Sequence, residues 1–238
     1  MNRAGRAFAA LALAGLLAAP AVAKPPRGGH PGLGTANPSA LVAAELAFAR
    51  MAAEKGQWAA FRKFAADDAV MFVPQTVRAH DWLKGRKDPA QALAWQPYQV
   101  WMSCDGTLGV TKGAWQRPDG AFGYFTTAWK RQKDGSYRWV MDQGDTLSAP
   151  LDKPDFLEAR VADCSPHGQS TKLRSEDSGI VVAGTASNAP SLLSGRSDDG
   201  TLIWAVAVQR RGARVLEVRW AKAGVMAMAL SSQVAEGD

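Results

Sequence analysis

The sequence has few of the residues from which metal sites are built. Only three of its 238 residues are histidine and two are cysteine. His30, His80 and His167 are far apart in the chain, and the cysteines Cys104 and Cys164 do not form a short-range pair. Metal ligands in proteins cluster at short, regular spacings that are missing here. The sequence therefore predicts no metal site.

Motifs for nucleophilic and nucleotide-dependent chemistry are also missing. No G-x-S-x-G elbow occurs, and the glycines between Gly106 and Gly113 precede no expected helix and carry no G-K-[ST]. We therefore expect neither a covalent nor a nucleotide-driven mechanism, and no cofactor. The formal net charge of +6 is modest, and no long basic run or recognition motif accompanies it. This charge pattern argues against a nucleic-acid partner.

A hydrophobic run long enough to span a membrane is absent, but the N-terminus resembles an export signal. Arg3 and Arg6 precede an apolar stretch around Leu11 to Leu17, and Ala21-Val22-Ala23 fits a cleavage site. The run is too short for a membrane span. No cysteine follows the cleavage site and the arginines are not adjacent, so lipid anchoring and a twin-arginine signal are not indicated. The sequence predicts a signal peptide at 1–23 and a periplasmic or secreted protein without membrane attachment.

The next segments predict a linker and then helices. Residues 24–37, rich in proline and glycine, are expected to be a disordered linker. A helix follows from Pro38-Ser39 to Gly56, with Leu41, Val42, Leu46, Phe48, Ala49 and Ala52 on its apolar face and Glu45, Arg50 and Glu54 pointing elsewhere. A second helix carries Trp58, Phe61 and Phe64. We expect a turn at Asp67-Asp68, a strand from Ala69 to Val73, and a short helix from Ala79 to Arg86.

Residues 95–145 predict four consecutive antiparallel strands. Their sequences are WQPYQVWMS, LGVTKGAWQ, AFGYFTTAWKR and YRWVMDQGD. Pro118-Asp119-Gly120 and Lys133-Asp134-Gly135-Ser136 supply the turn residues between the last three. Helices followed by such a meander indicate an α+β fold, in which the helices cover one face of a curved antiparallel sheet.

Residues 38–145 resemble the nuclear-transport-factor-2-like (NTF2-like), SnoaL-like superfamily, and specifically its secreted DUF4440 group. The matching pieces are Glu45 to Pro74, Trp95 to Pro97, Ser103 to Gly113 and Trp129 to Asp145. Leu108 to Gly113 is the most specific piece, because it is similar to the family pattern DLGYTxG, with Thr107 in place of the acid. The resemblance implies a conical sheet wrapped by helices around a cavity. The superfamily contains isomerases, hydratases, cyclases and non-enzymatic carriers, so fold alone does not assign chemistry.

Asp142 is the main candidate for catalysis. It lies near the end of the last meander strand, where alternation puts it with Arg138 and Val140, opposite Tyr137, Trp139, Met141 and Gln143. At the mouth of a cone, a desolvated acid would have a raised pKa suited to proton transfer. The alternative is a half-exposed acid offset by Arg138. His80-Asp81 and Asp67-Asp68 are weaker candidates, since a solvated helix start and a turn explain them.

The meander is rich in aromatic residues, which favours a pocket for a flat or apolar ligand. An ordinary sheet core explains many of them equally. The candidate ligand-binding residues are Trp95, Tyr98, Tyr124, Trp129 and Trp139. In an oxidising periplasm Cys104 and Cys164 could form a disulfide, and the alternative is two buried free thiols.

Beyond Asp145 the composition changes. Residues 148–178 are polar with one possible helical turn at Asp155 to Val161, and strands are expected at Ile180 to Ala183, Thr201 to Gln209, Val215 to Ala221 and Val225 to Leu230. They either extend the first sheet or form a β-rich extension over 146–238, which we favour.

Three functions fit this sequence. The first is an exported protein that binds a small apolar or aromatic molecule without a cofactor. The second is a cofactor-free isomerase or lyase with Asp142 as general base. The third is a structural or oligomeric interaction module, for which a homodimer is one form.

Overall fold

The computed structural model describes residues 36–164 and 191–236. All of them belong to one of the two units into which the chain divides, Gly32–Asp238. The expected signal peptide, all of the expected linker but residues 36 and 37, and the expected strand Ile180 to Ala183 lie outside the described residues. Within these ranges no helix is long and apolar enough to cross a membrane.

Helix α1 (Pro38–Lys55) begins and ends where the sequence predicts. The side chain of Asn37 accepts a hydrogen bond from the Ala40 N–H at its start, and Gly56 ends it with a φ of 108°. Its buried residues are Leu41, Glu45, Phe48 and Ala52, which recur every three or four positions. The expectation that Glu45 points away from the core is wrong. Its side chain is buried, because hydrogen-bond donors on the sheet bind its carboxylate in the core. Leu46, expected in the core, is 44% exposed.

The segment after α1 is more extended than expected. Helix α2 (Gln57–Phe64) leads directly into strand β1 (Ala65–Phe72), so Asp67-Asp68 lies inside a strand and not in a turn. The pairing of β1 shifts between Ala65 and Val70, and this irregularity leaves both acids exposed. A short strand β2 (Thr76–Arg78) and a helix α3 (Ala79–Leu83) follow.

The four predicted meander strands are confirmed. They are β3 (Ala94–Met102), β4 (Leu108–Gln116), β5 (Phe122–Arg131) and β6 (Tyr137–Thr146). The complete sheet has the order β2-β1-β6-β5-β4-β3-β7, and it is mixed because β1 pairs with β6, and β7 with β3, in parallel. The helical turn expected at Asp155 to Val161 is wrong, because residues 155–157 are not helical and the rest is strand β7 (Glu158–Val161). The sheet edge at β3 supplies the backbone partners that make this segment extended.

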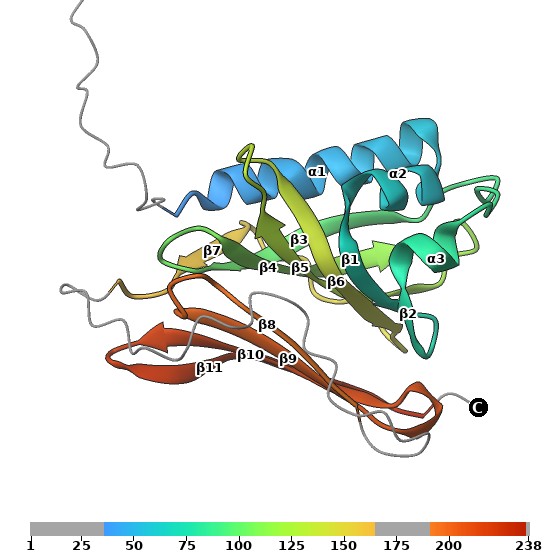
Figure 1. Cartoon of the computed structure of the whole chain (residues 1–238). Helices are drawn as coiled ribbons and strands as arrows, with labels where there is room; N and C mark the ends of the chain where they lie inside the picture. The colour runs from blue at the N-terminus through green and yellow to red at the C-terminus, as the bar shows by residue number, and fades with distance from the viewer. Residues whose placement is uncertain (1–35, 165–190, 237–238) are drawn as a thin grey trace, which may run out of the picture. The chain divides into compact units, whose positions relative to one another are not determined.

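The C-terminal strands form a sheet of their own. Its strands are β8 (Ser191–Arg196), β9 (Leu202–Val208), β10 (Arg214–Lys222) and β11 (Val225–Val234), in the order β11-β10-β9-β8. A 3-10 turn, η1 (Arg210–Gly212), joins β9 to β10. Figure 1 shows the first sheet between the helices on one face and this second sheet on the other. The expected α+β fold, with helices on one face of a curved sheet and a β-rich extension, is confirmed.

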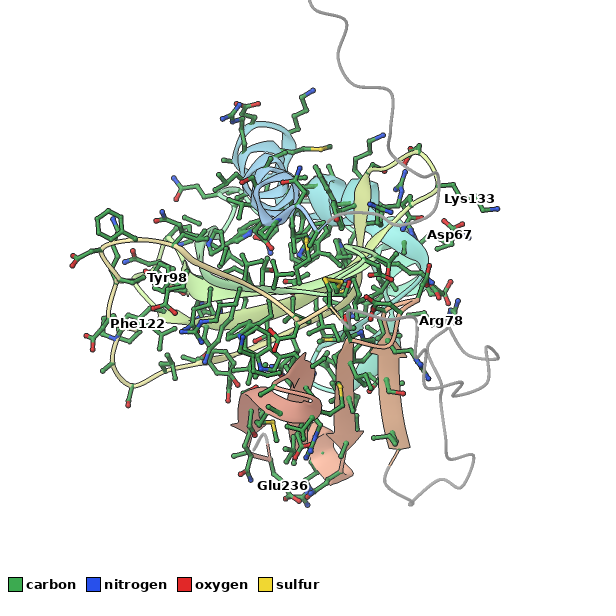
Figure 2. The ribbon with its side chains drawn as sticks, turned by 90° about the vertical axis from the view of Figure 1, so that its left-hand side faces the viewer. Asp67, Arg78, Tyr98, Phe122, Lys133 and Glu236 are labelled. Atoms are coloured by element: carbon green, nitrogen blue, oxygen red, sulfur yellow. A yellow bond between two sulfur atoms is a disulfide. The ribbon has the colours of Figure 1, made fainter. Side chains whose placement is uncertain are left out.

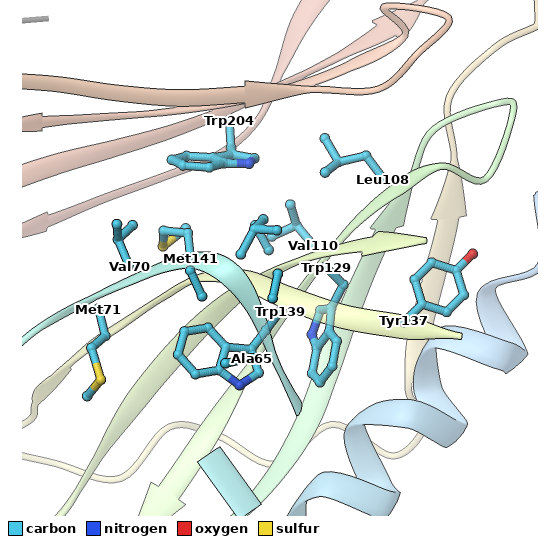
Figure 3. Close-up of a cluster of buried hydrophobic side chains, with 14 of the residues drawn as sticks. Ala65, Val70, Met71, Leu108, Val110, Trp129, Tyr137, Trp139, Met141 and Trp204 are labelled. Carbon is cyan, nitrogen blue, oxygen red and sulfur yellow. The ribbon is translucent and has the colours of Figure 1, made fainter. Parts of the chain in front are cut away.

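The second sheet buries the outer face of the first. Trp204 of β9 is fully buried, and Figure 3 shows it facing Val70, Met141 and Val110 of the first sheet. The alternation of buried and half-buried residues along β9 is the pattern of a strand with one face in a core. Burial of such apolar side chains contributes about 1.5–3 kcal/mol each. The second sheet is therefore part of the same core and not a separate module.

Two turns with the same sequence pattern connect the sheets at one end. Residues 103–108 and 197–202, here called the twin turns, both read S-x-D-G-T-L. The Asp105 N–H donates to Asp199 Oδ2 and the Asp199 N–H donates to Asp105 Oδ2, both at 2.9 Å. The Cys104 N–H donates to Thr201 Oγ1, and the Asp198 N–H to Thr107 Oγ1. Each turn therefore satisfies backbone donors of the other.

A disulfide lies beside the twin turns. It joins Cys104 to Cys164, which are separated by 60 positions in sequence and by 5.2 Å between their Cα atoms. It connects the first twin turn to the segment that follows β7.

Candidate functional site

A cavity of about 480 Å³ reaches from the helices across the first sheet to the second. Its apolar lining includes Phe48 of α1, Phe61 of α2 and Trp95 of β3. Asp142 and Thr127 line it from the sheet, and Gly212, Arg214 and Glu236 line it from the C-terminal part of the chain. A concave cavity that combines an apolar, partly aromatic wall with convergent polar groups is a common form of small-molecule site.

Cross-strand pairing places Asp142 on the cavity face. Asp142 of β6 is opposite Thr127 of β5, and Thr127 Oγ1 donates a hydrogen bond to Asp142 Oδ1 at 2.8 Å. Facing side chains of adjacent strands share one face of a sheet, so both residues reach the cavity. Asp142 remains partly exposed there, and its carboxyl is oriented by the threonine.

A bulge changes the alternation that the sequence predicts for β6. The pairing shifts between Ala128 and Trp129, so that Met141 opposes Ala128 but Trp139 opposes Trp129. Trp139 therefore faces α2, where its ring contacts that of Phe61. It lies on the same face of the sheet as Asp142, and Met141 lies on the opposite face. Figure 3 shows Trp129 and Trp139 directed away from Trp204.

Asp142 has a pKa of about 7, raised from 3.8. Removal of the carboxyl from water is the main cause, and the charge of Glu45 raises the pKa further. The Thr127 hydrogen bond and the positive charge of Arg214 act in the opposite direction. Near neutral pH this carboxyl is therefore present in both protonation states, which is the condition for a group that accepts and returns a proton.

Glu45 is a second buried acid, and no role for it is expected from the sequence. Its Oε1 accepts a hydrogen bond from Trp95 Nε1 at 2.7 Å, and its Oε2 accepts from Thr111 Oγ1 at 2.6 Å and from Trp129 Nε1 at 3.1 Å. Burial raises the pKa of Glu45, and these three donors oppose that rise. The carboxyl fixes the indole of Trp95 in the cavity wall. The three-and-four spacing of Glu45 with Leu41 and Phe48 was the signal that could have revealed its burial.

Arg214 is the third charged residue of the site, and it comes from the second sheet. Only 4% of it is exposed. Its Nε donates to Gln143 Oε1, its Nη1 to the carbonyl of Gly212, and its Nη2 to the carbonyl of Gly144, at 3.0, 3.0 and 2.7 Å. The guanidinium also lies 4.7 Å from the ring centre of Phe72. Nothing in the local sequence distinguishes Arg214 from the surface arginines around it, because its burial depends on contacts with β6.

Gly212 explains how Arg214 reaches the cavity. It has a φ of +80°, and a Cβ at this position would lie 2.9 Å from atoms of Pro74. Only glycine allows the β9–β10 connection to contact the chain after β1 this closely.

The five expected ligand-binding aromatics lie in different places. Trp95 lines the cavity. Tyr98 lines a smaller groove of about 310 Å³ with Phe122, and Figure 2 shows both on one flank of the first sheet. Tyr124 is directed toward the second sheet, close to Ser232 and Arg214. Trp129 and Trp139 are fully buried in the core.

The weaker acid candidates lie on other surfaces. Asp67 and Asp68 are exposed on β1, and His80-Asp81 forms the start of α3. In residues 36–164 and 191–236, no three histidine, cysteine, aspartate or glutamate side chains converge as a metal site requires.

Comparisons with known proteins give remote likenesses only. No family model and no curated protein matches the sequence. Among solved structures, a candidate ketosteroid isomerase from Parabacteroides distasonis has 15% identity and a TM-score of 0.37, and the match covers 45% of this chain and 88% of that one. A candidate aromatic ring hydroxylase from Novosphingobium aromaticivorans has 12% identity and a TM-score of 0.35, with 47% and 90% covered. A protein of unknown function with a cystatin-like fold from Methylobium petroleophilum has 10% identity and a TM-score of 0.35, with 52% and 86% covered.

Proposed function

We propose that the cavity binds a small, mostly apolar molecule and that Asp142 transfers a proton to or from it without a cofactor. The protein would then be an isomerase or lyase. The observation that supports this proposal is a carboxyl with a pKa of about 7 in an aromatic cavity. Acids with a perturbed pKa in a cleft are frequent at catalytic sites.

The geometry suits a general base. The hydrogen bond from Thr127 occupies Asp142 Oδ1 and fixes the plane of the carboxyl. Within the described residues no protein donor contacts Oδ2, which would take the proton. Phe48, Phe61 and Trp95 would exclude water from an apolar substrate and hold it against the carboxyl. Positioned acid–base catalysis of this kind typically contributes 10²- to 10⁴-fold in rate.

Two other functions use the same structure. A binding protein without turnover would use the aromatic lining alone and would need no titrating acid. An interaction module, including a homodimer, would use a free apolar surface, such as the exposed Leu192, Met226 and Met228 of the second sheet. The position of Asp142 in the cavity favours the enzyme over both.

We also propose that the chain is a divergent, exported member of the DUF4440 group. The pattern LGVTKG at residues 108–113 supports the group, and the N-terminal sequence supports export. The Cys104–Cys164 disulfide is what an oxidising periplasmic or extracellular environment would preserve. Non-reducing mass measurement of the exported protein tests both export and pairing. It should give a chain that begins near Lys24 and is two hydrogens lighter than its reduced form.

Proton exchange on a neutral carbon acid tests the proposed chemistry without knowledge of the substrate. 2-Tetralone is a compact aromatic ketone whose α-protons exchange with deuterium in D₂O, and NMR follows their loss. We expect the wild-type protein to accelerate the exchange and to bind the ketone, with quenching of tryptophan fluorescence. Asp142→Asn should retain binding and lose the acceleration, because an amide keeps the Thr127 hydrogen bond but cannot accept the proton.

Asp68→Asn, which changes an exposed acid on β1, is the matched control and should behave as wild type. Binding without acceleration in the wild type would support the binding-protein alternative. If the wild type does not bind the ketone and does not accelerate its exchange, the proposal as a whole is contradicted.

A further inference from the structure

We infer that the cavity selects apolar molecules that carry a carboxylate, and that Arg214 of the C-terminal sheet binds this group. The inference rests on the proposed function, because it names the class of molecule that the cavity would take. It assigns to the β-rich extension a direct part in recognition.

The first argument is that Arg214 carries a buried charge that no carboxylate contacts, although the charges of Asp145 and Asp142 act on it from a distance. Its three hydrogen bonds end on neutral oxygens, those of Gln143, Gly144 and Gly212. Within residues 36–164 and 191–236 no carboxylate forms an ion pair with it. By contrast, the four ion pairs of these ranges involve side chains that are 41–64% exposed. Buried charges in proteins are normally paired, because the loss of hydration is otherwise uncompensated.

The second argument concerns the donors that remain. A guanidinium has five N–H groups, and three of them are used. One N–H on Nη1 and one on Nη2 are left, on a side chain that lines the cavity. Two such donors on the two terminal nitrogens can bind the two oxygens of a carboxylate.

The third argument is the arrangement of the cavity around the charge. Phe48, Phe61 and Trp95 provide an apolar wall for the body of the ligand. Arg214 is close enough to Asp142 for its charge to lower the pKa of that carboxyl. A ligand between them would place its carboxylate on Arg214 and a reacting carbon toward Asp142. Three other charged residues line the cavity, namely Arg117, Asp145 and Glu236. Arg117 is half exposed, and its Nε lies 3.4 Å from Asp119 Oδ1.

A matched pair of probes separates charge from shape. 2-Naphthoate and 2-naphthamide have almost the same size, and only the first is an anion. We expect the wild-type protein at pH 6 to bind naphthoate at least 10-fold more tightly than naphthamide, as measured by calorimetry. Arg214→Gln should bring the ratio of the two dissociation constants to about one while the affinity for naphthamide is retained. Arg117→Gln is the control and should keep the wild-type ratio.

The outcomes are distinct. Equal affinity for both probes in the wild type, or loss of the preference in Arg117→Gln, would overturn the inference and leave the proposed function intact. No binding of either probe would contradict the proposed function itself. If Arg214→Gln does not fold, the ¹⁵Nε resonance of Arg214 in the wild type provides the test, because it should shift with naphthoate and not with naphthamide. An unchanged resonance with bound naphthoate would overturn the inference.

Discussion

At the scale of single residues, the ionisation of Asp142 opposes folding. Its pKa is about 7 in the folded chain against 3.8 for the free side chain, so the folded state holds this proton more tightly than the unfolded state. The free energy of unfolding therefore falls as pH rises from about 4 to about 7, and the contribution is constant outside that window. A shift of three units corresponds to roughly 4 kcal/mol, and the partial exposure of the side chain makes the real contribution smaller.

Asp142→Asn removes this titration. We expect the variant to match the wild type near pH 4 and to exceed its free energy of unfolding by roughly 1–4 kcal/mol at pH 8. Urea unfolding at both pH values measures the difference. A difference that does not change between pH 4 and pH 8 would show that Asp142 has an ordinary pKa in the folded protein.

The stability of the fold should depend on both carboxyl oxygens of Glu45. Both of its carboxyl oxygens accept hydrogen bonds from N–H or O–H donors, so the NH₂ group of a glutamine must face at least one of these donors. We expect Glu45→Gln to lower the free energy of unfolding by about 1–3 kcal/mol. Glu54→Gln, at an exposed position of the same helix, is the control and should cost little.

The same variant tests the coupling between the two acids. Since the charge of Glu45 raises the pKa of Asp142, Glu45→Gln should lower the ¹³C NMR titration midpoint of the Asp142 carboxyl. An unchanged midpoint would mean that Glu45 is itself protonated in the folded chain.

At the scale of elements, the connection between β9 and β10 positions the cationic side of the cavity. Gly212→Ala adds a Cβ where Pro74 leaves no room, at a φ of +80°. Gly224→Ala is a matched control, because its φ is also +80° but nothing lies within 4 Å of the added Cβ. The control should cost about 1–2 kcal/mol for the left-handed backbone. Gly212→Ala should cost more in thermal unfolding and should also weaken the preference for naphthoate. An equal loss of stability in Gly212→Ala and Gly224→Ala would show that the close contact with Pro74 does not position this connection.

Most of the first sheet could be predicted from sequence, because its strands alternate and glycine turns separate them. The elements that were missed depend on distant partners. Strand β7 is extended because it pairs with β3, and β1 extends through Asp67-Asp68 because an irregular pairing tolerates two acids there. At the site, Asp142 could be singled out as an acid at a strand end, but the bulge that turns Trp139 toward the helices has no local signal. Glu45 and Arg214 could not be found because long-range contacts bury them.

At the scale of the whole molecule, the disulfide ties the first sheet to the chain that leads toward the second. Removal of this link with Cys104→Ser and Cys164→Ser together should lower the free energy of unfolding by on the order of 4 kcal/mol, since the bond closes a long loop. Urea unfolding with and without a reductant measures this, and the double variant should not respond to the reductant. A wild-type protein that is equally stable in both conditions would contradict the expected contribution.

The twin turns have a consequence for any shortened version of the chain. Each turn offers the same donors and acceptors that it receives, so the pair is self-complementary in the way that the two halves of a symmetric dimer are. A fragment that ends after Cys164 would expose one half of this joint together with the apolar outer face of the first sheet. The best available complement to that surface is the same surface on a second molecule. We therefore expect the fragment to dimerise in sedimentation measurements, and Asp105→Ala to weaken the dimer. A contact within one chain would then become an interface between two chains.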